Sequence, residues 1–453
     1  MKLRAVVPSR AAVAALVLLA CGATAALLAG VPLRQVALTG GTILAAALLW
    51  ALADLSYSRR AWDRARVRLQ RTLPTAFALG TPTEVSLRFT HPGGRPWQVE
   101  VFDAPDARFA VEGLPKRVRL APTSRTTLRY TVTALHRGPV AFGTTSLRCR
   151  SRGGCFDLLY AAGEPQELRV YPNFAAVAGY AWLAGDRRLS QIGIKSYASR
   201  GQGTDFRQLS EYRRGEPVRH IDWKATQRQG KPIVREFQDE RDQRVLFLLD
   251  CGRRMRADET GSGPGGSHFD HALNALMLLG YVALKEGDEV GALTFGNRPG
   301  ERRDYVPRKG VGTFNALMNR LYDLQPAPVH SDYLQAAQDL LRHFPRRALV
   351  IVLTNFRDED APELAPALRL LRRRHLVLVA SLRERVLRGL AERPLTHPDD
   401  AVTAATAHLF DQNRRDAFAR IVAGDPLSLD VEPAQLPAAL VNRYHAVKRA
   451  GLL

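Results

Sequence analysis

Two long uncharged stretches near the N-terminus constrain this chain more than any other feature. Residues 11–31 carry no charged side chain, residues 36–53 carry none, and only Pro32, Leu33, Arg34 and Gln35 separate them. At a rise of about 1.5 Å per residue, each stretch is long enough to cross a hydrocarbon core of about 30 Å as a helix. We therefore predict a transmembrane helical hairpin within residues 1–60.

The arginines around this hairpin predict its orientation. Lys2, Arg4 and Arg10 precede the first stretch and six arginines follow the second between Arg59 and Arg71, whereas Arg34 alone lies between the two. Because basic residues stay on the cytoplasmic side, we expect a multi-pass inner-membrane protein whose N-terminus and C-terminal soluble domains are both cytoplasmic. A cleaved signal peptide ending near Cys21 is the alternative, but the residues after Cys21 remain apolar.

Residues 61–175 change to short runs in which apolar and polar side chains alternate. Val85, Leu87 and Phe89 form one such run, and Leu128, Tyr130 and Val132 form another, with Pro, Gly, Ser and Asp between runs. Alternation with a period of two indicates strands with one buried face. We expect six to seven strands in an immunoglobulin-like β-sandwich, which serves as a spacer or binds a partner through its edges.

Residues 241–453 read as an α/β domain with C-terminal helices. Continuous apolar strands, at Val245 to Asp250, Val290 to Phe295, Leu349 to Phe356 and Leu376 to Leu382, alternate with helical segments. Such strands indicate a mostly parallel, Rossmann-like sheet covered on both faces, with ligands at the carboxyl ends of the strands. Asp250 falls at such an end.

The run that begins at Asp250 resembles the first strand end of a von Willebrand type A domain. That family places Asp-x-Ser-x-Ser there, and its oxygens bind Mg²⁺ with a Thr and an Asp from later loops. Here Gly252 and Arg254 replace both serines, and Asn355 stands at the later acid position, while Thr313 keeps an oxygen. We expect a degenerate site without metal, in which Arg254 pairs with Asp250; Asp250 is the one position where Mg²⁺ would bind.

Between these domains, residues 176–240 contain a charged and aromatic segment, Gly203 to Phe237, that closely resembles the signature of the bacterial domain of unknown function 58 family. The likeness extends to RGPVAFG at Arg137 to Gly143, although Glu216 stands where the family has Asp. The signature positions that we expect to form a structural latch or an interaction site are Asp205, Phe206, Glu211, Tyr212, Arg219, Asp222, Trp223, Lys224, Arg235 and Glu236. Mixed charges of this kind suit a partly buried ion-pair network.

Composition excludes several classes of function. The formal net charge is +21, yet the basic residues are spread along the chain without an aromatic-lined basic stripe, so no specific nucleic acid is expected. The four cysteines form no CxxC pair, and no phosphate-binding loop ends in Gly-Lys-Ser or Gly-Lys-Thr. We therefore expect no cofactor and no catalytic residue, and the sequence identifies no small-molecule substrate.

The resemblance implies a non-enzymatic, membrane-anchored scaffold or adaptor. Proteins of that family accompany a MoxR-type AAA+ ATPase and assist the assembly or maturation of envelope or other protein complexes. The alternative is a hydrolase or nucleic-acid-binding protein that uses the basic region from His220 to Lys224. No nucleophile accompanies His220 and Asp222 in the sequence, which favours the adaptor.

Overall fold

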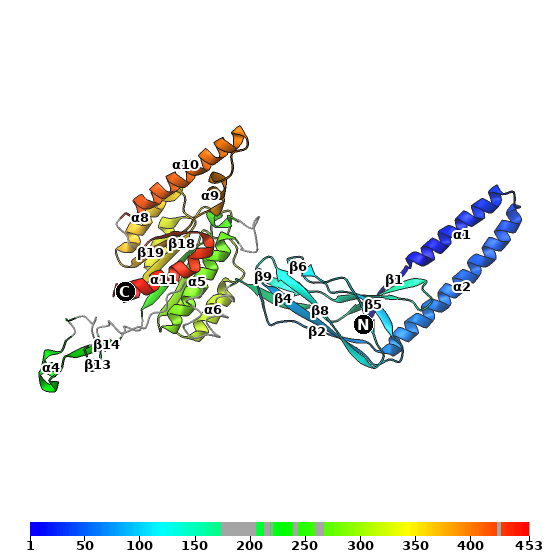
Figure 1. Cartoon of the computed structure of the whole chain (residues 1–453), viewed down its shortest axis with the longest axis horizontal. Helices are drawn as coiled ribbons and strands as arrows, with labels where there is room; N and C mark the ends of the chain where they lie inside the picture. The colour runs from blue at the N-terminus through cyan, green and yellow to red at the C-terminus, as the bar shows by residue number, and fades with distance from the viewer. Residues whose placement is uncertain are drawn as a thin grey trace. The chain divides into compact units, whose positions relative to one another are not determined.

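The chain forms two compact units, Met1–Val170 and Tyr171–Leu453. The structure, a computed structural model, describes residues 1–173, 205–212, 218, 221–238, 243–258, 267–423 and 427–452. Figure 1 colours the elements from β1 in blue to α11 in red.

Two apolar helices lie side by side near the N-terminus, as Figure 1 shows. Helix α1 spans Arg10–Leu28 and α2 spans Leu33–Ala65, and both are long and apolar enough to cross a membrane. The predicted pair of helices is confirmed. Helix α2 continues beyond the predicted end at residue 53, and its last turns bury Asp54, Ser58 and Trp62.

A strand that we did not predict precedes the hairpin. Strand β1, Lys2–Pro8, pairs antiparallel with β11, Phe156–Ala162, and its Leu3 and Val6 pack on the core of the first unit. The segment before α1 and the segment after α2 therefore belong to the same folded unit.

The rest of the first unit is built mostly from antiparallel strands, more than the six to seven that the sequence suggested. The sheets have the orders β1-β11-β10-β5-β7, β2-β4-β8-β6 and β3-β12-β9. The further strands are β2 (Arg68–Thr72), β3 (Phe77–Ala78), β4 (Pro82–His91), β5 (Trp97–Phe102), β6 (Phe109–Glu112), β7 (Lys116–Leu120), β8 (Ser124–Ala134), β9 (Gly138–Phe142), β10 (Thr145–Arg150) and β12 (Gln166–Tyr171).

Alternating side chains of these strands form one core. Val85, Leu87 and Phe89 of β4 are fully buried, as their spacing predicts. The stacked rings of Trp62 and Tyr160 join the end of α2 to β11 in the same core.

The second unit contains a six-stranded sheet of order β17-β16-β15-β18-β19-β20, in which only β17 runs antiparallel to its neighbour. Its strands are β15 (Arg244–Asp250), β16 (Glu289–Phe295), β17 (Tyr305–Arg308), β18 (Leu349–Thr354), β19 (Leu376–Leu382) and β20 (Leu429–Val431). Its helices are α5 (His268–Lys285), α6 (Val311–Leu321), α7 (Tyr333–His343), α8 (Ala361–Arg372), α9 (Arg385–Ala391), α10 (Pro398–Ile421) and α11 (Leu436–Arg449).

Helices cover both faces of this sheet, which explains why its strands are continuously apolar. Val245, Phe247 and Leu249 of β15 share one core with α5, α6 and α11. Leu246 and Leu248 face a second core with α7, α8 and the end of α10. Opposite faces of the one strand thus carry two cores, and the carboxyl ends of β15, β16 and β18 meet at one edge.

Candidate functional site

Asp250 ends β15 at the carboxyl edge of the parallel sheet, where its side chain is fully buried. Its Oδ1 accepts hydrogen bonds from the Ser331 hydroxyl (2.5 Å) and the Gly252 amide (2.8 Å). Its Oδ2 accepts from the Thr354 hydroxyl (2.7 Å), with the Tyr333 hydroxyl at 3.4 Å. Both carboxylate oxygens of Asp250 therefore accept hydrogen bonds from groups of the protein.

Ser331 occupies the space that a side chain at position 252 would need. A Cβ built on Gly252 would lie 2.0 Å from Ser331 Oγ and 2.8 Å from the carbonyl oxygen of Val329. Gly296 is equally confined, because a Cβ there would lie 2.8 Å from the Gly252 nitrogen. The loops after β15 and β16 and the loop before α7 thus pack against one another at this edge.

Arg254 forms different ion pairs from the one expected. Its guanidinium pairs with Glu359 and, at 3.3 Å, with Asp360, both next to the N-terminus of α8. The expected pairing with Asp250 is therefore wrong, because hydroxyl and amide donors, which carry no charge, already hold that carboxylate. The arginine instead joins the loop after β15 to the start of α8.

The two remaining positions taken from the metal-site pattern make other contacts. The Thr313 hydroxyl lies at the start of α6 and donates to the carbonyl oxygen of Lys309 at 2.8 Å. The buried Asn355 amide donates to the carbonyl oxygen of Arg254 (3.1 Å) and to Glu384 Oε1 (3.3 Å).

Burial sets the protonation chemistry of this site. It raises the pKa of Asp250 above its ordinary value, against the opposing effect of the hydrogen bonds from Ser331 and Thr354. Burial and the neighbouring Asp250 likewise raise the pKa of the Tyr333 hydroxyl well above its ordinary value. Oxygen ligands for a cation here would be Asp250, Ser331 and Thr354, but an ion would have to replace hydrogen bonds that these groups already share.

The signature segment forms a small hairpin module. Strand β13 (Asp205–Glu211) pairs antiparallel with β14 (Ile233–Gln238), and α4 (Trp223–Gln229) lies between them in sequence. Glu211 pairs with Lys231 at the end of the strands next to the connecting segment, and the amide of Tyr212 donates to the carbonyl oxygen of Pro232 at 2.9 Å. Asp205, Phe206 and Glu236 belong to the paired strands, whereas Arg219 and His220 lie outside the described residues.

Asp222 is the structural centre of this hairpin module. Its Oδ1 accepts from the amides of Lys224 and Ala225, both at 3.0 Å, and so caps the N-terminus of α4. Its Oδ2 accepts from Arg235 Nε of β14 at 2.8 Å. The Ala225 amide and the Arg235 guanidinium lower the pKa of Asp222, so the carboxylate remains charged and engaged.

Around this capped helix the module exposes apolar side chains. Trp223 is 67% exposed and Leu209 is 44% exposed. Lys224 and Arg228 on the same helix are exposed as well. The ion pair of Asp222 with Arg235 thus joins the start of α4 to β14, while Trp223 on the same helix is exposed.

Ser331, Tyr333 and Thr354 contact Asp250 in the candidate site, and we did not predict them from the sequence. Thr354 ends the apolar strand β18, so its place at the carboxyl edge was readable from the pattern. Ser331 and Tyr333 flank Asp332, which caps α7, and nothing in their spacing from Asp250 signals contact across the sheet.

These observations define a protein with two membrane-length apolar helices, a β-rich unit and a helix-covered α/β unit. The family model for proteins of unknown function DUF58 matches residues 208–425, and this part of the chain belongs to that family. No curated protein matches the chain.

Solved structures resemble only parts of the chain. The pilus adhesin SpaC from Lactobacillus rhamnosus GG is 11% identical with a TM-score of 0.32, over 47% of this chain and 31% of the adhesin. Proximal thread matrix protein 1 from the mussel byssus is 10% identical with a TM-score of 0.28, over 46% of each chain. A mutant of Salmonella alpha-2-macroglobulin is 25% identical with a TM-score of 0.20, over 23% of this chain and 7% of the macroglobulin.

Proposed function

We propose that this protein is a membrane-anchored, non-enzymatic adaptor that binds partner proteins through its signature hairpin module. The observation that carries this proposal is Trp223, which is 67% exposed in a module that its own ion pairs otherwise hold together. Tryptophan and arginine are enriched among the residues that dominate protein interfaces. The exposed Lys224 and Arg228 of the same helix favour a partner whose surface is acidic around an apolar socket for Trp223.

The state of the two most prominent carboxylates supports an adaptor over a hydrolase. Asp250 is buried and accepts hydrogen bonds on both oxygens. Asp222 caps a helix and pairs with Arg235. A general base must reach a substrate proton, but Asp250 is fully buried, and the lowered pKa of Asp222 makes that carboxylate a weak base.

We also propose a fold type for each of the two units. The helix-covered sheet with Asp250 at its carboxyl edge supports a von Willebrand type A-like domain in which Ser331 fills the space of the lost serine side chain. The antiparallel sheets of the first unit support an immunoglobulin-like sandwich.

For the membrane, we infer that α1 and α2 cross the bilayer as a hairpin, with both ends in the cytoplasm. The pairing of β1 with β11 supports this arrangement, because it requires the residues before α1 and after α2 to lie on one side. The excess of arginine after α2 favours the cytoplasmic side.

The proposed partner is a MoxR-type AAA+ ATPase, together with the complexes that it helps to assemble. The test is purification of the tagged full-length chain from membranes, followed by quantitative mass spectrometry, for the wild type and Trp223→Ala. We expect the recovery of such an ATPase to fall about tenfold or more, because an interface tryptophan is commonly worth at least ~2 kcal/mol.

Phe410→Ala is the matched control, since Phe410 is also exposed, on α10, outside the hairpin module. Its recovery of the ATPase should equal that of the wild type. Equal recovery with Trp223→Ala, or no AAA+ ATPase in any sample, would contradict the proposal.

A further inference from the structure

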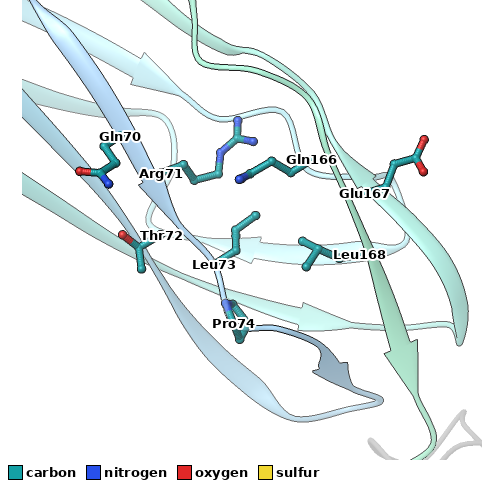
Figure 2. A pocket seen from close by; sticks show the side chains of 8 residues that line it. All are labelled: Gln70, Arg71, Thr72, Leu73, Pro74, Gln166, Glu167 and Leu168. Atoms are coloured by element: carbon teal, nitrogen blue, oxygen red, sulfur yellow. The ribbon is translucent and has the colours of Figure 1, made fainter.

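A groove in the first unit lies between two strand edges. It has a volume of about 530 Å³, and Gln70 to Pro74 line one side while Gln166 to Leu168 line the other. Figure 2 shows β2 and its following loop on one side and β12 on the other, with the Arg71 side chain directed from β2 toward β12. This volume lies in the range of natural ligand pockets.

The lining residues are consecutive in sequence on each side of the groove, which indicates that strand edges, and not sheet faces, line it. Successive side chains of a strand point to opposite faces of its sheet, so a groove lined by every residue in turn meets the edge of each strand. Strand β2 pairs with β4 on its other edge, and β12 pairs with β9 along Gln166 to Val170. The edge of β2 that meets the groove is therefore opposite its ladder with β4.

The chain closes one end of this groove. After β2 it passes Leu73 and Pro74 and forms β3, which pairs with β12 in the order β3-β12-β9. Strand β12 thus has a neighbouring strand on each edge, β3 and β9, and its residues Gln166 to Leu168 line the groove. The edge of β2, the outer strand in the order β2-β4-β8-β6, is therefore the one to which an extended segment in the groove can pair.

The floor of the groove is apolar and firmly held. Leu73 and Leu168 are partly exposed and pack on the core. Beneath them the buried Arg71 guanidinium donates to Asp103 Oδ1 at 2.5 Å and to Thr145 Oγ1 at 3.2 Å. Asp103 also accepts from the Tyr130 hydroxyl at 2.5 Å. A preorganised floor reduces the entropy lost when a ligand binds.

The charge at the groove favours one kind of occupant. Arg71 is neutralised by Asp103, so the exposed Glu167 is the remaining formal charge among the eight lining residues, all of which the structure describes. From these features we propose that the groove binds an extended segment of a partner protein by strand addition. That segment places an apolar side chain over Leu73 and Leu168 and a lysine or arginine beside Glu167. This site goes beyond the proposed role of the hairpin module and does not depend on it.

The experiment selects phage-displayed nine-residue peptides on the full-length chain in lipid nanodiscs. We expect enriched peptides that alternate apolar and polar residues and carry a basic residue. Binding of the synthetic peptides should protect the backbone amides of Gln70 to Thr72 and Gln166 to Leu168 from hydrogen exchange. Trp223→Ala should bind the same peptides with unchanged affinity.

Two groove variants and one control make the test specific. Glu167→Lys should weaken binding about threefold to fivefold, the effect of an exposed ion pair, and a peptide with glutamate in place of its basic residue should restore it. Thr72→Trp, at an exposed position of β2, should abolish binding by filling the groove. Glu112→Lys, an exposed acid of β6, should have no effect.

Three results would overturn the proposal. One is a selection that enriches no peptide, which would mean that the groove binds no extended segment. The second is equal binding to the wild type and Thr72→Trp, or amide protection outside β2 and β12. The third is self-association of the wild type that Thr72→Trp abolishes, which would assign the groove to a second copy of the chain.

Discussion

At the scale of residues, the distinctive feature is a carboxylate that the protein itself has saturated. Asp250 accepts from Ser331, Gly252 and Thr354, and Ser331 lies where a side chain at position 252 would be. A buried carboxylate is tolerated only when hydrogen bonds compensate for its lost hydration. Glycine at position 252 and serine at position 331 therefore depend on each other.

Gly252→Ala should destabilise the second unit by about 1–3 kcal/mol, because the added methyl group must displace Ser331 or the Val329 carbonyl. Chemical denaturation of the full-length chain measures this change. Ser331→Ala in the same chain should recover part of the loss, whereas Gly312→Ala, where nothing lies within 4 Å, serves as the control. Equal stability of Gly252→Ala and the wild type would show that the loops do not pack as described.

Asp250→Asn should change how stability depends on pH. Burial raises the pKa of Asp250 above 3.8, so the folded state binds its proton more tightly than the unfolded state. The resulting stabilisation is complete below about pH 3.8 and is lost as the pH rises through the folded-state pKa. The free energy of unfolding of the wild type, relative to Asp250→Asn, should therefore fall as the pH rises across this window, and a constant difference would refute the assignment.

At the scale of elements, the carboxylate of Asp54 joins α2 to the loop between β10 and β11. Asp54 accepts from the Ser151 hydroxyl (2.5 Å), the Gly153 amide (2.6 Å) and the Cys155 amide (3.2 Å). A Cβ on Gly153 would lie 2.8 Å from the Asp54 carboxyl carbon, so the loop can approach only as glycine. The helix and the loop between β10 and β11 thus form one joint.

Asp54→Ala should loosen this joint, because it leaves the Gly153 and Cys155 amides and the Ser151 hydroxyl without their acceptor. The expected cost is about 1–3 kcal/mol for each group that stays buried and unpaired. Hydrogen exchange by mass spectrometry should show faster exchange at residues 152–155 than in the wild type. Asp63→Ala, at an exposed position of the same helix, is the control, and unchanged exchange in Asp54→Ala would mean that the contact does not hold the loop.

At the scale of the whole molecule, strand β1 closes the hairpin on itself. Its pairing with β11 returns the N-terminus to the unit that follows α2, so both ends of the hairpin must lie on one side of any membrane that it crosses. A hairpin held at both ends is a firmer anchor than a single helix with a free N-terminus.

The test uses Lys2→Cys and Thr75→Cys, each alone in a chain whose native cysteines are replaced by serine. Both cysteines should react with a membrane-impermeant maleimide from the same side of the membrane. Labelling of inside-out vesicles but not of intact cells would place both positions in the cytoplasm. A cysteine at Pro32, between the helices, should show the reverse pattern. Labelling of Lys2 and Thr75 from opposite sides would exclude the double crossing.

The local patterns determined the parts of this protein that depend on near neighbours in the sequence. Uncharged runs predicted the two apolar helices, and alternation predicted that Val85, Leu87 and Phe89 lie in the core. Continuous apolar strands predicted the parallel sheet with helices on both faces. Each pattern reflects the surroundings of one segment, so it can be read without knowing the rest of the fold. The family signature located the hairpin module by its motif.

Only the tertiary structure decided the partners of those segments. Ser331 reaches Asp250 across 81 positions, Arg254 pairs beside α8, and β1 joins β11, because these contacts depend on which strand ends and edges the fold brings together. Sheet order likewise determines that β2 is an outer strand whose edge meets the groove. A sequence pattern records whether a side chain is buried, but sheet order determines what it is buried against.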